Sequence, residues 1–298
     1  MTWFKNLTLY RLTEPFTLTP EQVGEAIARH AFRPCAGLDA FTYGWESPLG
    51  PAGEALVHAA NGCILVCARR EEKLMPPAVI NDALEERIAR IEGQDGRTVR
   101  RREKQRLRDE VIFDLLPRAF TRSARTFAYL APASGWLVVD ASSPRKAEDL
   151  VVLLGDSLTT LAVEPWLPSL SPQVEMTRWL EHGRAPDGFA ILEDCELRDP
   201  ADVGALVRCQ KQDLGGDEIR AHLRARKQVH RLALGFGEHL SFLLGADLSI
   251  RRLRFENVEV LDEQDQPDEI ARFDANFAYM TSALGVFLER LHAVFGDG

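Results

Sequence analysis

Basic side chains are concentrated in one short stretch of the chain, RTVRRREKQRLRDE, which spans residues 97–110. Such side chains could neutralise the phosphate groups of a polyanion. On a helix, with about 100° per residue, most of them fall within roughly 60° of one another: Arg97, Arg101, Lys104 and Arg108, with Arg100 beside them. The acids Glu103, Asp109 and Glu110 fall on the other side, so we expect them to leave this basic stripe unneutralised. The spacing is equally typical of an ordinary solvated helix face.

A second basic cluster lies between residues 208 and 231, although the formal net charge of the chain is −9. Its basic residues outnumber three acids: Arg208, Lys211, Arg220, Arg224, Arg226, Lys227 and Arg231. The segment 256–274 has the opposite bias, with eight acids and only Arg272. Charges segregated in this way create strong local fields whatever the overall sign.

Catalytic motifs are weak in this chain. The string LLGDSL contains the GDSL motif of a family of serine esterases, but Ser157 ends an apolar helical run in mid-chain and no D-x-x-H follows near the C terminus. The histidines have no HExxH or other zinc-ligand spacing. The glycines in DLGGDE and LGFGEH lack the Gly-Lys-Ser/Thr of a phosphate-binding loop. We therefore predict no enzymatic activity, no metal site and no cofactor.

The cysteines indicate a reducing compartment. There are five of them, an odd number, and no CxxC pair, so we expect no disulfide framework, and we expect Cys63 and Cys67 to be buried thiols. No apolar run approaches the roughly 20 residues that a membrane span requires. We expect a cytoplasmic protein without membrane contact.

The order of the predicted elements indicates an α/β (α+β) fold with mixed sheets, packed helices and a projecting helical arm. Three parts are expected: residues 1–75 with 125–165 as an N-terminal α/β unit, 76–124 as a helical arm with the basic stripe, and 166–298 as a C-terminal α/β unit. Two local signals are clear. Asn61-Gly62 predicts a hairpin turn, and Thr19 with Gln22 predicts a capping box at the start of a helix. The apolar spacing of residues 268–292 predicts a long helix with one buried face, from Ile270 to Leu291.

Strings along the whole chain resemble the bacterial recombination-associated RdgC family. They are WFKNLTLYRL at 3–12, AFRPC at 31–35, NGCILVCARREEKLMPPAVI at 61–80, DEVIFDLLPRAF at 109–120, KAEDLVVLL at 146–154, KQDL at 211–214 and RFDANFAYMT at 272–281. The resemblance implies a DNA-binding protein, not an enzyme, that forms a ring-shaped homodimer around duplex DNA. It also implies binding of single- and double-stranded DNA without sequence preference, restraint of RecA-promoted recombination, and a place at the nucleoid.

The resemblance also assigns roles to individual positions. Arg118 and Phe120, in LLPRAF, match a region where the arms of two subunits meet, with Phe120 as an apolar contact at that gate. Lys211 and Gln212 match positions associated with DNA contact, and Lys227 falls in the second basic cluster. The 97–110 stretch departs from the pattern because it is richer in arginine than expected for the family.

The expected DNA contacts combine both clusters: Arg97, Arg100, Arg101, Lys104, Arg108, Arg118, Lys211, Gln212, Arg224 and Lys227. Phosphate contacts of this kind give affinity without base readout and make binding depend steeply on salt. Two alternatives stay open. Phe120 could instead stack on bases or belong to a core, and the chain could be a protein-interaction scaffold whose basic arm docks an acidic partner, such as the 256–274 segment of another subunit.

Overall fold

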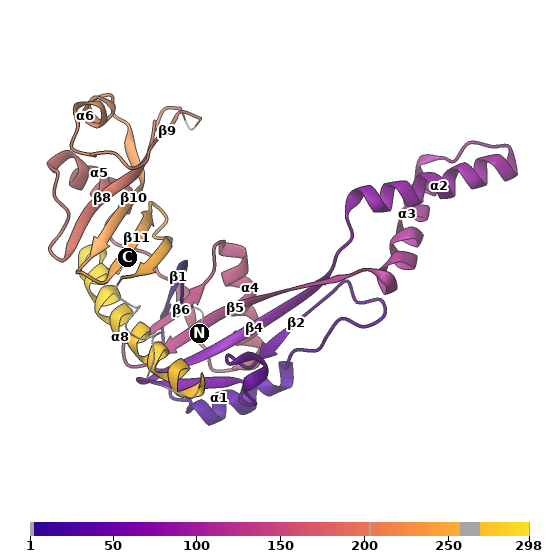
Figure 1. Cartoon of the computed structure of the whole chain (residues 1–298), viewed down its shortest axis with the longest axis horizontal. Coiled ribbons are helices and arrows are strands. Elements are labelled where there is room, and N and C mark those ends of the chain that lie inside the picture. The colour runs from indigo at the N-terminus through magenta and orange to yellow at the C-terminus, as the bar shows by residue number, and fades with distance from the viewer. Residues whose placement is uncertain (1–2, 203, 257–268, 298) are drawn as a thin grey trace. The chain divides into compact units, whose positions relative to one another are not determined.

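The computed structural model describes residues 3–202, 204–256 and 269–297, which form helices and a many-stranded sheet (Figure 1). The predicted mixed α/β class is confirmed. The chain divides into two compact units: unit 1 contains Met1–Ile27, Ser47–Cys67 and Thr126–Gly298, and unit 2 contains Ala28–Glu46 and Ala68–Arg125. The division into three parts stays a prediction.

Unit 2 contains the pair of helices expected between residues 76 and 124. Its elements are β2 (Phe41–Glu46), α2 (Pro77–Asp95) and α3 (Arg101–Leu115), together with the unit 2 portions of β4 (Cys63–Lys73) and β5 (Thr121–Ala131). The strand order is β2–β4–β5. The helix pair thus connects the ends of two neighbouring strands (Figure 1).

Unit 1 holds the remaining elements. Its helices are α1 (Pro20–Ile27), α4 (Pro144–Ser157), α5 (Pro172–His182), α6 (Asp217–Arg224) and α8 (Glu269–Phe295). Its strands, besides parts of β4 and β5, are β1 (Leu7–Leu12), β3 (Val57–Ala60), β6 (Trp136–Asp140), β7 (Val163–Pro165), β8 (Phe189–Arg198), β9 (Leu206–Cys209), β10 (Gln228–Phe236), β11 (Leu240–Gly245) and β12 (Ile250–Phe255).

The sheet of unit 1 is continuous from β5 to β9, in the order β5–β6–β1–β12–β11–β10–β8–β9, and the paired strands run antiparallel. Leu7 of β1 connects the strands β5–β6 on one side with β12–β9 on the other, because it pairs with Asp140 of β6 and with Ile250 of β12. Next to this pairing, the Leu253 amide of β12 donates a 2.9 Å hydrogen bond to the carbonyl of Lys5, which precedes β1.

The two clear local signals of the sequence are confirmed. Asn61 and Gly62 have φ angles of 51° and 70° and join β3 to β4, as a two-residue hairpin turn with positive φ requires. At the start of α1, the Gln22 amide donates to Thr19 Oγ1 at 3.3 Å, and the Thr19 amide donates to Gln22 Oε1 at 2.9 Å. These reciprocal bonds form a capping box and satisfy donors that the helix leaves open.

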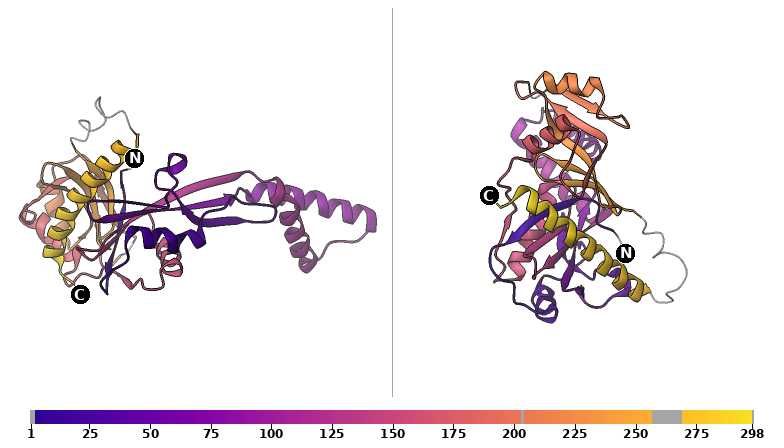
Figure 2. Two further views of the ribbon diagram at one scale, coloured as in Figure 1. Left: turned by 90° about the horizontal axis from the view of Figure 1, so that it is seen from below. Right: turned by 90° about the vertical axis from the view of Figure 1, so that its left-hand side faces the viewer.

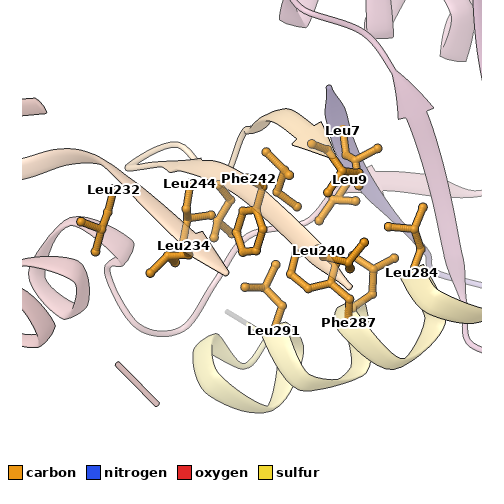
Figure 3. Packing of buried hydrophobic residues seen from close by; sticks show 14 of the residues in the cluster. Leu7, Leu9, Leu232, Leu234, Leu240, Phe242, Leu244, Leu284, Phe287 and Leu291 are labelled. Atoms are coloured by element: carbon orange, nitrogen blue, oxygen red, sulfur yellow. The ribbon is translucent and has the colours of Figure 1, made fainter. Parts of the chain in front are cut away.

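The apolar face of α8 packs against β10 and β11 and belongs to the core of unit 1 (Figures 2 and 3). Phe287 is fully buried among the rings of Phe189, Phe236 and Phe242. The stripe predicted from Ile270 is wrong at its first member, because the Ile270 side chain, in the first turn of α8, is 49% exposed. The covered face thus begins at Phe273, one turn further along.

Candidate nucleic-acid interface

The basic stripe lies at the start of α3, but the helix does not include all of it. Gly96, with φ of 64°, ends α2 in the left-handed conformation that glycine adopts readily, and its amide donates to the Glu92 carbonyl at 3.0 Å. Residues 97–100 then form a connection, and α3 begins at Arg101. The prediction of one helical stripe is therefore wrong for Arg97 and Arg100, which precede the helix.

Arg97 is held by acids of its own segment. Its Nη1 and Nη2 atoms each donate a 2.8 Å hydrogen bond to the Glu103 carboxylate, and its Nε donates to Asp95 at 3.3 Å. The bonds from Arg97 lower the pKa of Glu103, and those to Glu103 raise the pKa of Arg97. The expectation that the acids leave the stripe unneutralised is thus wrong for Arg97, because the connection folds it back onto the first turn of α3.

Other bases of this region are exposed and carry no ion pair within the described residues. They are Arg100, Arg101, Arg102, Lys104 and Arg118. Arg102 was not among the predicted contacts, although it belongs to the same run in the sequence. Arg108 is half-buried and donates a 2.9 Å hydrogen bond to Asn81 of α2. Cations without a local partner are the ones best able to neutralise phosphates.

Packing between α2 and α3 explains which side of α3 stays open. Leu107 and Val111 are buried, as is Leu84 of α2. Arg87 of α2 forms ion pairs with Glu110 and Asp114 of α3, at 3.4 and 2.8 Å. Leu107 and Val111 are thus covered and Glu110 and Asp114 are engaged with α2, whereas the bases of the first turn of α3 remain in solvent.

Phe120 is the most exposed large apolar side chain in the described part of the chain, at 85%. Its backbone is fixed, because the Leu74 amide donates a 2.7 Å hydrogen bond to its carbonyl at the start of β5. The alternative that Phe120 belongs to the core of this chain is therefore wrong. Contact with a second subunit and stacking on bases remain open, and Arg118 lies exposed two residues before it.

The second basic cluster lies in unit 1, around β9 and α6. The Lys211 amide donates to Asp194 Oδ1 at 3.0 Å and the Gln212 amide donates to the Glu193 carbonyl at 3.2 Å. Both side chains are exposed. Lys211 has a φ of 52°, a left-handed conformation that is uncommon for residues other than glycine. The backbone of this pair is thus anchored to β8 while the side chains reach solvent.

Not every base of this cluster is available. Arg224, in the last turn of α6, is exposed without an ion pair among the described residues. The Lys227 side chain is only 17% exposed, and its Nζ lies 3.7 Å from Asp199 Oδ2. Arg208 and Arg231 both pair with Glu196, each at 3.1 Å. Four bases of the cluster are therefore exposed without an ion pair among the described residues: Lys211, Arg220, Arg224 and Arg226.

Two arginines that the sequence analysis missed lie near Lys211. Arg252 and Arg254 of β12 line, with Lys211, a cavity of about 620 Å³. Their signal was the string LSIRRLRF, read only as a strand, which carries three arginines among its apolar residues. In the structure, Arg252 and Arg254 are exposed, whereas Leu253 between them is buried.

The side chains tested for catalysis do not form a nucleophilic site. Ser157 is buried, and its hydroxyl donates a 2.7 Å hydrogen bond to the Leu153 carbonyl. Cys63 and Cys67 are buried thiols, as predicted; Cys195 and Cys209 are buried as well, and Cys35 is partly exposed. Burial, together with the neighbouring Cys209, raises the pKa of Cys195 to about 12, so this thiol stays protonated and poorly reactive at neutral pH.

Two further searches concern only the described residues. Among residues 3–202, 204–256 and 269–297, no three or more His, Cys, Asp or Glu side chains are grouped so as to hold a metal ion. Within the same ranges, every helix is too short or too polar to cross a membrane.

Comparison with known proteins gives one consistent result. Residues 2–298 match the family model described as "Putative exonuclease, RdgC". The chain is 45% identical over 296 residues to the recombination-associated protein RdgC of Aeromonas hydrophila, covering 99% of this chain and 98% of that protein. It is 44% identical to the protein of the same name from Tolumonas auensis (99% and 98% covered) and 39% identical to that from Proteus mirabilis (99% of each).

Proposed function

This chain belongs to the RdgC family, and from that premise we propose that it is a recombination-associated protein that binds DNA without sequence preference. The observation that carries the proposal is the group of exposed bases at the start of α3 that have no ion pair within the described part of the chain, in a protein whose net charge is −9. Acids elsewhere repel nucleic acid, whereas Arg100, Arg101 and Lys104 attract phosphates locally. The proposed contacts are non-specific, because phosphates carry no sequence information.

The proposed contact residues are those predicted from the sequence, divided here into residues that are exposed and residues that already bind another side chain. Arg100, Arg101, Lys104, Arg118, Lys211, Gln212 and Arg224 are exposed. Arg97, Arg108 and Lys227 would have to exchange Glu103, Asn81 and Asp199 for phosphate. We expect the second group to contribute less, because each exchange breaks an existing interaction.

Two copies of the chain would form a ring around duplex DNA and thereby restrict RecA. The family resemblance is the ground for the ring, and the exposed side chain of Phe120 supports a contact with a second copy. Occupying or encircling DNA needs no covalent chemistry, so we propose that the protein is not an enzyme and requires no cofactor. By the same reasoning it would be cytoplasmic and associated with the nucleoid.

A salt titration tests the proposal. Binding to a fluorescent duplex of random sequence is measured between 50 and 400 mM salt, with the mass of the protein determined in each buffer. We expect a dimer and a steep negative slope of log affinity against log salt, about −0.9 for each phosphate neutralised. Undetectable binding at low salt, or binding that salt does not change, would contradict DNA binding.

The description of the family model requires a separate test, because it names an exonuclease. DNA labelled at either end is incubated with the protein and Mg²⁺ or Mn²⁺. If labelled nucleotides are released, and this nuclease activity co-purifies with the protein, the proposal that the protein is not an enzyme would be overturned.

The same titration tests the scaffold alternative. Poly-glutamate is added as a competitor, because the alternative pairs the basic arm with acidic protein segments. Most of the proposed acidic segment, residues 257–268, lies outside the described residues. Competition by poly-glutamate equal to that by DNA would favour the scaffold.

A further inference from the structure

The cavity beside Lys211 lies on the face of the unit 1 sheet opposite α8. Its volume is about 620 Å³, and its lining comes from β8, β10, β11, β12 and the turn after β9. On β12, Leu253 is buried while Arg252 and Arg254 are exposed. The core side of these strands is therefore apolar and packed, whereas the cavity side carries bases.

A β-bulge aims Arg252 into this cavity. Ser241 of β11 lies opposite Arg254 of β12, but Leu243 lies opposite Arg251, so three residues of β11 (241–243) correspond to four of β12 (251–254). The extra residue changes the alternation, so that Ile250 and Leu253 are both buried although they are three residues apart. Arg252 lies within the bulge and has a φ of 52°. Bulges of this kind redirect a side chain.

Two cationic residues at the cavity, Lys211 and Arg252, have the same unusual backbone conformation, each with a φ of 52°. A non-glycine residue at positive φ is strained, and such residues cluster at active sites and ligand sites. Both residues are held by one carboxylate. Asp194 accepts the Lys211 amide at 3.0 Å on Oδ1 and the Arg252 Nη1 at 3.4 Å on Oδ2.

The charges around the cavity are unbalanced toward the positive. Three basic side chains, Lys211, Arg252 and Arg254, face one lining acid, Asp194. The nearby Glu256 accepts a 2.8 Å hydrogen bond from Ser241. Lys211 and Arg254 have no ion pair among the described residues, and the Arg252 side chain is 61% exposed. A site with this excess of cations favours an oxyanion.

We propose that this cavity binds the phosphodiester backbone of DNA, with Arg252 and Arg254 as contact residues beside Lys211. Asp194 positions the site, because it holds the Lys211 backbone and the Arg252 guanidinium. This inference rests on the proposed DNA binding and extends it to a strand face that sequence reasoning did not include. Arginine suits the role, because its guanidinium presents several donors to one phosphate.

The test compares charge-removing and charge-retaining variants of the full chain. Arg252→Gln/Arg254→Gln removes both charges, and Arg252→Lys/Arg254→Lys keeps them. Neither adds backbone strain at residue 252, because glutamine and lysine, like arginine, are unbranched at Cβ and meet a similar cost at positive φ. Arg145→Gln/Arg184→Gln is the matched control, since it removes two charges from exposed arginines of unit 1 outside the cavity.

With a random-sequence duplex, we expect the glutamine variant to reduce the salt slope by about 2 and the affinity at 0.1 M salt by roughly 10- to 100-fold. The lysine variant should keep the slope, and its thermal melt checks the fold independently. A wild-type slope in the glutamine variant would overturn this inference alone, as would an equal loss in the control. Failure of the wild-type protein to bind would instead overturn the proposed function.

Discussion

Arg97 and Glu103 are joined by two hydrogen bonds of 2.8 Å, which close the connection between α2 and α3 onto the first turn of α3. The Glu103 carboxylate therefore fixes the connection and also neutralises Arg97, one of the arginines of the basic stripe. The two effects can be separated, because the connection has a second anchor. The Val99 amide donates to Glu92 Oε1 at 2.8 Å.

Glu103→Gln should strengthen DNA binding. The substitution keeps a polar side chain but releases the Arg97 charge, so we expect the salt slope to become steeper by about 1. Duplex affinity measured against salt gives the result. Glu86→Gln is the control, because Glu86 pairs with Arg90 on α2, outside the stripe. An equal change in both variants would mean that only net charge matters.

Phe120→Ser should weaken self-association and leave the fold intact. The ring is 85% exposed, so its loss should change the free energy of unfolding by no more than about 0.5 kcal/mol. Mass measurements at several concentrations report association, and binding to circular and short linear duplexes reports closure around DNA. We expect the larger loss with circular DNA, which has no ends. Phe41→Ser, at a 52% exposed ring of the same unit, is the control, and equal losses on both DNA forms would count against a gate.

Lys227 and Arg224 should differ in what they support. Lys227→Gln removes a largely covered ion pair with Asp199 and should lower the free energy of unfolding by about 1 kcal/mol with little change in the salt slope. Arg224→Gln should leave stability unchanged and reduce the slope by about 1. Urea unfolding and DNA titration of both variants check this. A reduced slope for Lys227→Gln would show that DNA displaces Asp199.

Phe287→Ala should destabilise unit 1 strongly. Its ring is fully buried between α8 and the sheet, and truncation of a buried phenylalanine costs about 3 to 5 kcal/mol. The neighbouring Val286 is 61% exposed, so Val286→Ala should cost less than about 0.5 kcal/mol. Urea unfolding measures both, and similar costs would contradict the observed packing of α8.

Stability should fall as the pH drops below about 6.5, in part because of His58. Burial lowers the pKa of His58, and the nearby Asp274 opposes this shift without cancelling it. At a pH between the pKa of His58 in the unfolded chain and its lower pKa in the folded chain, the unfolded chain binds a proton that the folded chain does not. Lowering the pH through this range therefore favours unfolding. His58→Gln should lose less stability than the wild type between pH 7.5 and 5, as measured by urea midpoints. His230, whose pKa is also lowered, is present in both proteins, so the difference isolates His58.

Several features of this protein could be predicted from the sequence because they depend on neighbouring residues. The turn at Asn61-Gly62 and the capping box of Thr19 and Gln22 are set by local backbone geometry and short hydrogen bonds. The long helix α8 is set by a regular apolar period. The family strings and the two basic clusters are likewise local in the chain.

Only the tertiary structure decided which charges are free and where the cavity lies. Helical periodicity placed Arg97 on one stripe with Arg101, but the left-handed turn at Gly96 folds Arg97 onto Glu103. Lys227 forms an ion pair with Asp199, and a bulge in the pairing of β12 with β11 redirects Arg252. Ion pairs and strand register depend on residues that are distant in sequence or lie beyond a turn, so the spacing of one segment cannot determine them.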